Sequence, residues 1–150
     1  MERAENAIEQ LIEAYKNKVR ENVLTIVYNQ QLDQFKFAEA FNLNKLNIMQ
    51  CNKIQFTHVP LNITELTVSH CQIESIEGIE QMKQLTVLNL NRNNISNILP
   101  ISSLINLKEL HMSYNKIQDI SAIKYLTKHK QYNGHIGHKH FNQSIISISQ

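Results

Sequence analysis

The stretch LTVLNLNRNNISNILPISSLIN, residues 85–106, decides the fold of this chain. Leu88 and Leu90 alternate with polar side chains, as in a short strand with one buried face. Asn93 then stands where a further apolar residue would continue the pattern. The stretch therefore predicts a strand that ends in a turn, and the turn carries an amide side chain.

The same pattern recurs along the chain, which makes it a repeat. Stretches 63–84 and 107–128 have apolar residues at positions 1, 4, 6, 11, 14, 17 and 20 of a 22-residue unit, as does the stretch between them. Upstream, two units that begin at residues 21 and 43 keep the pattern loosely. We therefore expect a five-coil array over residues 21–128, with coils starting at residues 21, 43, 63, 85 and 107.

Position 9 of the unit holds a small polar residue in every coil. Where the chain leaves a strand, its buried backbone groups lose their ladder partners, and an Asn side chain can both donate to and accept from them. Cys at this position is smaller and tolerates burial, so Cys51 and Cys71 are interpreted as buried thiols rather than a disulfide or a redox switch. The predicted structural turn positions are Asn29, Cys51, Cys71, Asn93 and Asn115.

The pattern LxxLxLxxNxIxxIxxIxxL, seen at 85–104 and 107–126, resembles the leucine-rich repeat. It is similar to the 22-residue type found in regulatory subunits of type 1 protein phosphatase and in bacterial internalins. The resemblance implies an α/β solenoid with a parallel sheet on its concave side and 3₁₀ turns or loops on its convex side. It also implies binding of another protein on the concave sheet.

The two ends of the array need caps, because an outermost coil otherwise exposes its apolar flank. Residues 1–20 have apolar side chains at helical spacing, with acidic residues early and basic residues late, so they predict an N-terminal capping helix. Residues 129–150 fail the repeat and predict a His-rich tail or a degenerate cap. If nothing covers the fifth coil, a homodimer is expected to form there.

Four histidines crowd into the C-terminal segment, which raises an alternative in which the protein binds a metal. No Cys or carboxylate accompanies them in that segment, so we predict no metal site and keep this alternative second. The four residues are His129, His135, His138 and His140.

Charge and composition narrow the class of protein. Lys+Arg 15 against Asp+Glu 13 gives a net charge of +2, too little to favour nucleic acid or an anionic membrane as partner. No stretch is long and apolar enough to span a bilayer or to act as an export signal, so a cytoplasmic location is expected. There is no phosphate-binding glycine loop and no nucleophile elbow. We therefore predict no catalytic residues, no enzyme activity and no cofactor.

The functional prediction concerns the side chains that point outward from the predicted strands and from the turns that follow them. Aromatic and Arg side chains supply most of the binding energy in protein interfaces. We predict a non-catalytic protein-protein interaction module, and a phosphatase regulatory subunit is a narrower alternative. The candidate partner-binding residues are Arg92, Tyr114, His111, Tyr28, Asn89, Asn91, His70 and Met49.

Overall fold

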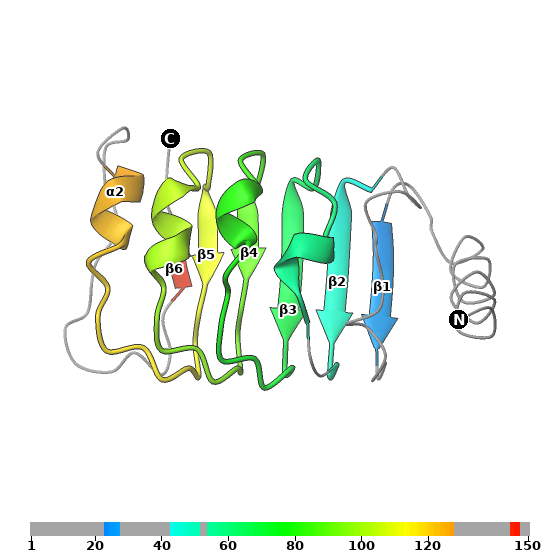
Figure 1. Ribbon diagram of the computed structural model, residues 1–150, viewed down its shortest axis with the longest axis horizontal. Coiled ribbons are helices and arrows are strands. Elements are labelled where there is room, and N and C mark those ends of the chain that lie inside the picture. Colours follow the sequence, from blue (N-terminus) through cyan, green and yellow to red (C-terminus); the bar gives the residue numbers. More distant parts are fainter. Residues whose placement is uncertain (1–22, 28–42, 52–53, 128–144, 148–150) are drawn as a thin grey trace.

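The computed structural model describes residues 23–27, 43–51, 54–127 and 145–147. Within these residues, five parallel strands and one antiparallel strand form one sheet in the order in which they occur in the chain (Figure 1). The parallel strands are β1 Val23–Val27, β2 Lys45–Met49, β3 Glu65–Ser69, β4 Val87–Asn89 and β5 Glu109–His111. Because sequential strands are spatial neighbours, the chain winds in one direction as a solenoid.

The strand register follows the sequence repeat. Successive parallel strands begin 22, 20, 22 and 22 residues apart. Leu66 is the partner of Leu88 and Leu88 is the partner of Leu110, so equivalent residues lie side by side on neighbouring strands. The same register extends back through β2 to β1. The α/β solenoid implied by the resemblance to leucine-rich repeats is therefore confirmed.

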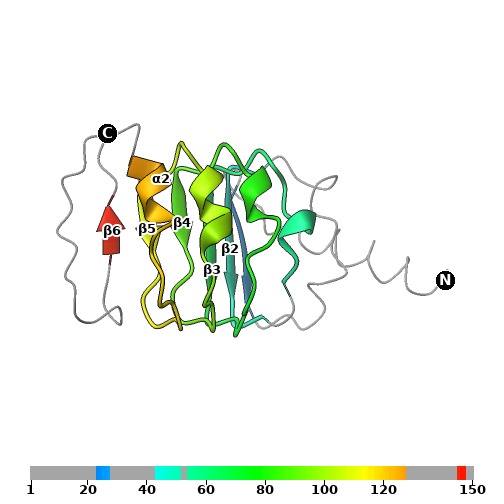
Figure 2. The same cartoon turned by 60° about the vertical axis from the view of Figure 1, so that its left-hand side comes forward.

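Coils two to five each return along one side of the sheet through a short helical segment (Figures 1 and 2). Apolar residues three apart suit 3₁₀ turns, in which residues i and i+3 point the same way. The fixed φ of Pro100, near the start of the third of these segments, is compatible with a helical turn. The segments are η3 Phe56–His58, η4 Ile79–Gln81, η5 Leu99–Ser103 and α2 Ile123–Thr127.

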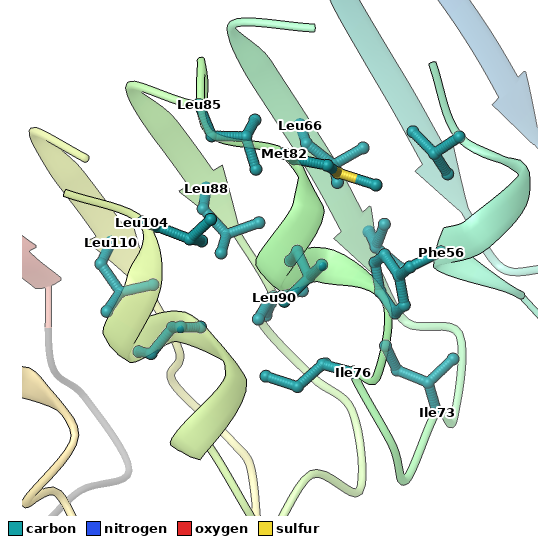
Figure 3. Packing of buried hydrophobic residues seen from close by; sticks show 14 of the residues in the cluster. Phe56, Leu66, Ile73, Ile76, Met82, Leu85, Leu88, Leu90, Leu104 and Leu110 are labelled. Carbon is teal, nitrogen blue, oxygen red and sulfur yellow. The ribbon is translucent and has the colours of Figure 1, made fainter. Parts of the chain in front are cut away.

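The core is a continuous layer between the sheet and these returning segments (Figure 3). All seven repeat positions of 63–84 and of 85–106 are buried. Of the seven in 107–128, Ile120 alone is only partly buried. Phe56 fills the core beside the irregular second coil, which is two residues shorter than its neighbours. Stacking therefore merges the apolar rows of separate coils into one core.

The C-terminal edge of the sheet is paired. Strand β6, Ile145–Ser147, runs antiparallel to β5, and Leu110 is the partner of Ile146. Unpaired strand edges invite association with other chains. Strand β6 pairs with β5 and so covers part of the fifth coil, where a homodimer was expected if the coil were uncovered. The homodimer stays a prediction. The N-terminal cap at 1–20 and the four histidines lie outside the described residues, and the domain limits stay predictions. No helix among the described residues is long and apolar enough to cross a membrane.

Candidate functional site

The sheet face opposite the returning helical segments carries no helix in the described part of the chain (Figure 2). We call it the open sheet face. Most of its side chains are half-buried or exposed, whereas Ser69, expected to point outward, is only 7% exposed. The open sheet face consists of Val23, Thr25, Val27, Lys45, Asn47, Met49, Glu65, Thr67, Val87, Asn89, Asn91, Glu109, His111 and Ser113.

Carboxylates on this face have cationic or basic neighbours. The Lys45 ammonium lies 2.7 Å from the carboxylate of Glu65 on the next strand. Nε2 of His111 lies 3.7 Å from the carboxylate of Glu109 on the same strand. Opposite charges thus compensate one another locally, and the face is largely neutral and polar.

Asparagine side chains tie neighbouring parts of the face together. Nδ2 of Asn47 donates to Oγ1 of Thr25, 3.1 Å away on the preceding strand. Oδ1 of Asn89 accepts from the Asn91 backbone N–H at 3.0 Å, and Oδ1 of Asn91 accepts from the Ser113 backbone N–H at 2.7 Å. The amide oxygens of Asn89 and Asn91 are therefore used within the protein, while their Nδ2 groups have no partner among the described residues.

In each of coils two to five, the residue at position 8 of the unit, which follows the strand, adopts left-handed backbone geometry. These residues are Gln50, His70, Arg92 and Tyr114, with φ between 56° and 58°, and we call them the αL row. A non-glycine residue in this conformation costs about 1–2 kcal/mol.

The hydrogen bonds of the αL row explain its geometry. The backbone N–H groups of Gln50, His70 and Arg92 each donate to a carbonyl of the next coil, at 3.1, 3.3 and 2.9 Å. The turn thus continues the ladder between coils beyond the last strand residue. All four side chains of the row are exposed along one edge of the open sheet face.

Two members of the row contact each other. The guanidinium carbon of Arg92 lies 4.8 Å from the ring centroid of Tyr114, which is a cation–π geometry. Tyr114 is 47% exposed. Among the described residues no carboxylate forms an ion pair with Arg92. The face therefore presents a cation that is held against an aromatic ring and has no acidic partner within the described part of the chain.

Asn93 lies directly behind this pair and is 6% exposed. Its Nδ2 donates to the Val68 carbonyl at 2.8 Å and to the Leu90 carbonyl at 3.0 Å, and its Oδ1 accepts from the Cys71 N–H at 3.0 Å. Asn115 donates in the same way to the Leu90 and Met112 carbonyls, at 2.9 and 3.0 Å. These amides join consecutive coils beneath the αL row.

Cys71 occupies the same turn position one coil earlier. Its Sγ donates to the Ser69 carbonyl at 3.1 Å, and that of Cys51 donates to the Met49 carbonyl at 3.2 Å. Both thiols are buried, and neither forms a disulfide. Desolvation raises the pKa of Cys71 to about 11, so it is protonated and poorly nucleophilic at neutral pH.

The structure brings some of the predicted partner-binding residues together and separates others. His70, Arg92 and Tyr114 share the αL row, and Asn89, Asn91 and His111 lie on the adjoining open sheet face. Met49 is half-buried at the end of β2. Tyr28 and Asn29 lie outside the described residues.

Sequence reasoning missed Gln50 as the fourth member of the αL row. Positive φ is normally predicted from Gly or Asn, and position 8 of the unit holds neither in these coils. The signal that could have identified it is the repeat itself, because equivalent positions in a stacked array share one backbone conformation.

The helix-bearing side of the sheet has shallow hollows lined by few ionisable side chains. One, of about 320 Å³, is lined by Asn97, Leu99, Asp119 and Ser121, among others. The Ser121 backbone N–H and hydroxyl both donate to the carboxylate of Asp119, which lowers its pKa. The described residues contain no cluster of three or more metal-ligating side chains.

Comparison with known proteins agrees with this architecture. The family model described as "Leucine Rich repeats (2 copies)" matches residues 61–103 and 83–125. Residues 61–125 of this chain therefore match the leucine-rich repeat family. A search of curated protein sequences found no significant match.

Two solved structures of internalins from Listeria monocytogenes are similar in fold. The internalin inlF has a TM-score of 0.63 at 23% identity, covering 70% of this chain and 32% of its own. The internalin inlC2 has a TM-score of 0.53 at 29% identity, covering 57% of this chain and 39% of its own. The matched part thus corresponds to about a third of the internalin chains.

Proposed function

We propose that this protein is a non-catalytic module that binds a protein or peptide on its open sheet face. Support comes first from the fold, since leucine-rich repeat solenoids present a broad sheet on which side chains of several coils can act together. The open sheet face is neutral and polar, with its charges largely compensated, as suits a protein partner better than a nucleic acid backbone.

The observation that carries the proposal is the exposed Arg92–Tyr114 pair. Arg and Tyr are enriched among the residues that dominate interface energies. Here the contact between them, 4.8 Å from guanidinium carbon to ring centroid, restricts both side chains before a partner arrives. Restricting a side chain in advance reduces the entropy lost on binding.

A catalytic role has less support. Enzyme sites are usually concave pockets that exclude water and bring titratable groups together. The hollow beside Asp119 is lined by hydroxyl, amide and aliphatic groups and places that carboxylate at the surface, hydrogen-bonded to its own turn. The metal-binding alternative depends on histidines outside the described residues, and the phosphatase alternative has no specific observation in its favour.

Affinity capture from lysate, followed by mass spectrometry, tests the proposal. The bait would be the full chain, compared with an Arg92→Ala/Tyr114→Ala variant. A matched control, Glu77→Ala/Leu99→Ala, alters two exposed residues on the helix-bearing side. We expect proteins captured by the wild type and the control to be lost from the Arg92/Tyr114 variant, while all three circular dichroism spectra agree. Capture of the same proteins by all three baits would contradict the proposal.

A further inference from the structure

We propose that Arg92 is the docking point for an Asp or Glu side chain of a bound protein segment that lies along the αL row. This inference rests on the proposed function and specifies the chemistry of the partner. The argument combines the distribution of charge, the geometry of the guanidinium and the backbone cost of the row.

The first step is electrostatic. Lys45 already pairs with Glu65 at 2.7 Å, and Glu109 has His111 as its neighbour at 3.7 Å. Arg92 is an exposed cation of this region for which the described residues supply no carboxylate. An incoming carboxylate would therefore meet at Arg92 a positive charge that no described carboxylate neutralises, while elsewhere on the face it would compete with Glu65 or Glu109.

The second step concerns geometry. A guanidinium can bind both oxygens of a carboxylate in parallel, and the planar fork loses less freedom when it is already fixed. Contact with the Tyr114 ring, 4.8 Å from guanidinium carbon to ring centroid, restricts the Arg92 side chain. Nδ2 of the preceding residue, Asn91, has no partner among the described residues and offers a further donor beside the site.

The third step concerns the backbone. Gly and Asn tolerate left-handed geometry at the lowest cost, yet the αL row carries Gln, His, Arg and Tyr. Asn is common in this chain and occupies the very next position in two coils, at Asn93 and Asn115. The αL row therefore places a long side chain, rather than Gly or Asn, at one exposed position in four successive coils.

A random peptide library displayed on phage and selected on the immobilised full chain tests the inference. We expect peptides selected on the wild type to be enriched in Asp or Glu at one position. The best peptide is then synthesised with the acidic residue and with its amide counterpart, Asn or Gln. Both forms are titrated against the wild type and against Arg92→Gln in a double-mutant cycle.

The substitution Arg92→Gln is chosen because Gln50 already occupies the equivalent turn with φ 57°, so the fold accepts Gln there. Either change alone is expected to weaken binding about tenfold or more, and both together no more than one alone. Arg92→Lys keeps the charge without the fork and should recover part of the affinity. Lys108→Gln, which removes an exposed charge before β5, should leave affinity within about twofold.

The outcomes separate the inference from the proposed function. Peptides that bind the open sheet face but lack an acidic position, or that show additive effects in the cycle, would overturn the role of Arg92 and leave the proposed function standing. Enrichment of hydrophobic peptides that bind Arg92→Gln equally well would do the same. If every selected peptide bound the Arg92→Ala/Tyr114→Ala variant as tightly as the wild type, or if no peptide were selected, the result would count against both the role of Arg92 and the proposed function.

Discussion

At the scale of single residues, Asn93 explains why an amide interrupts an apolar stretch. Its side chain serves three carbonyls and one N–H, and two of these four groups belong to the preceding coil. Ala would remove every one of these hydrogen bonds. A thiol, as at Cys71, keeps a weak donor and loses the acceptor.

Asn93→Ala is therefore expected to lower the free energy of unfolding by about 2 to 4 kcal/mol, since the Val68 carbonyl and the Cys71 N–H are left without this partner at about 1–3 kcal/mol each. Asn93→Cys should cost less, because the thiol can still donate. Urea unfolding followed by circular dichroism measures both. Equal losses for the two variants would show that the donor function of the amide contributes nothing.

Cys71 makes the stability depend on alkaline pH. Burial raises the pKa of its thiol from 9.0 to about 11, so folding favours the protonated thiol. This contribution is fully present below pH 9 and is lost as pH rises from about 9 to 11. Between pH 8 and pH 10 the wild type should lose about 1 kcal/mol more stability than Cys71→Ala. Parallel stability curves for the two proteins would refute the assignment.

These residue-scale features differ in how far the sequence predicts them. The need for an amide at position 9 follows from the sequence, because the chain must leave a strand there with its backbone groups buried. The stacking of Arg92 on Tyr114 does not follow, because it depends on how two side chains of different coils leave their turns. Both residues could be chosen from their type, but their contact required coordinates.

At the scale of elements, the strand and the turn that follows it form one unit. In the strand, buried and outward-facing side chains alternate. The left-handed residue that follows turns the backbone, and its own N–H still donates to a carbonyl of the next coil. No Gly or Asn marks this position, so the sequence alone gives no sign of the conformation. The direction of β6 was equally hidden, because a three-residue strand has too few side chains to fix its pairing.

Glycine substitution tests the strain in the turn. At Gln50, with φ 57°, glycine relieves about 1–2 kcal/mol of strain and adds about 0.5–1 kcal/mol of unfolded-state entropy. Gln84 is also exposed but has no positive φ, so glycine there brings the entropy cost alone. We expect Gln50→Gly to be more stable than Gln84→Gly by about 1 kcal/mol in thermal and urea unfolding. The reverse order would mean that the turn is unstrained.

At the scale of the whole molecule, no coil has a core of its own. Each coil's inward side chains touch those of its neighbours, as Figure 3 shows for Leu66, Leu88 and Leu110. The repeat period alone predicted this arrangement, because seven apolar positions recur in register and a single coil buries too little surface to fold. The two ends were harder to predict, since caps lie outside the period and follow no repeated pattern.

Leu88→Ala in the fourth coil should therefore destabilise the array as a whole. The side chain is fully buried, and such truncations cost about 2–5 kcal/mol. Far-UV circular dichroism and tyrosine fluorescence should still give one shared transition. Leu99→Ala, at a residue 59% exposed, is the control and should stay within about 0.5 kcal/mol of wild type. Separate transitions for the two probes would show that the coils unfold independently.

The amides beneath the αL row have one more consequence. Asn93 forms hydrogen bonds with backbone groups of the third coil, and Asn115 with those of the fourth, so each unit satisfies groups of its predecessor as well as its own. A tandem duplication of residues 85–106 would bring both halves of this connection with it, and each new junction would find its partner already present. The array can therefore gain or lose whole units, and the sheet gain or lose strands, without any change to the residues that join neighbouring coils.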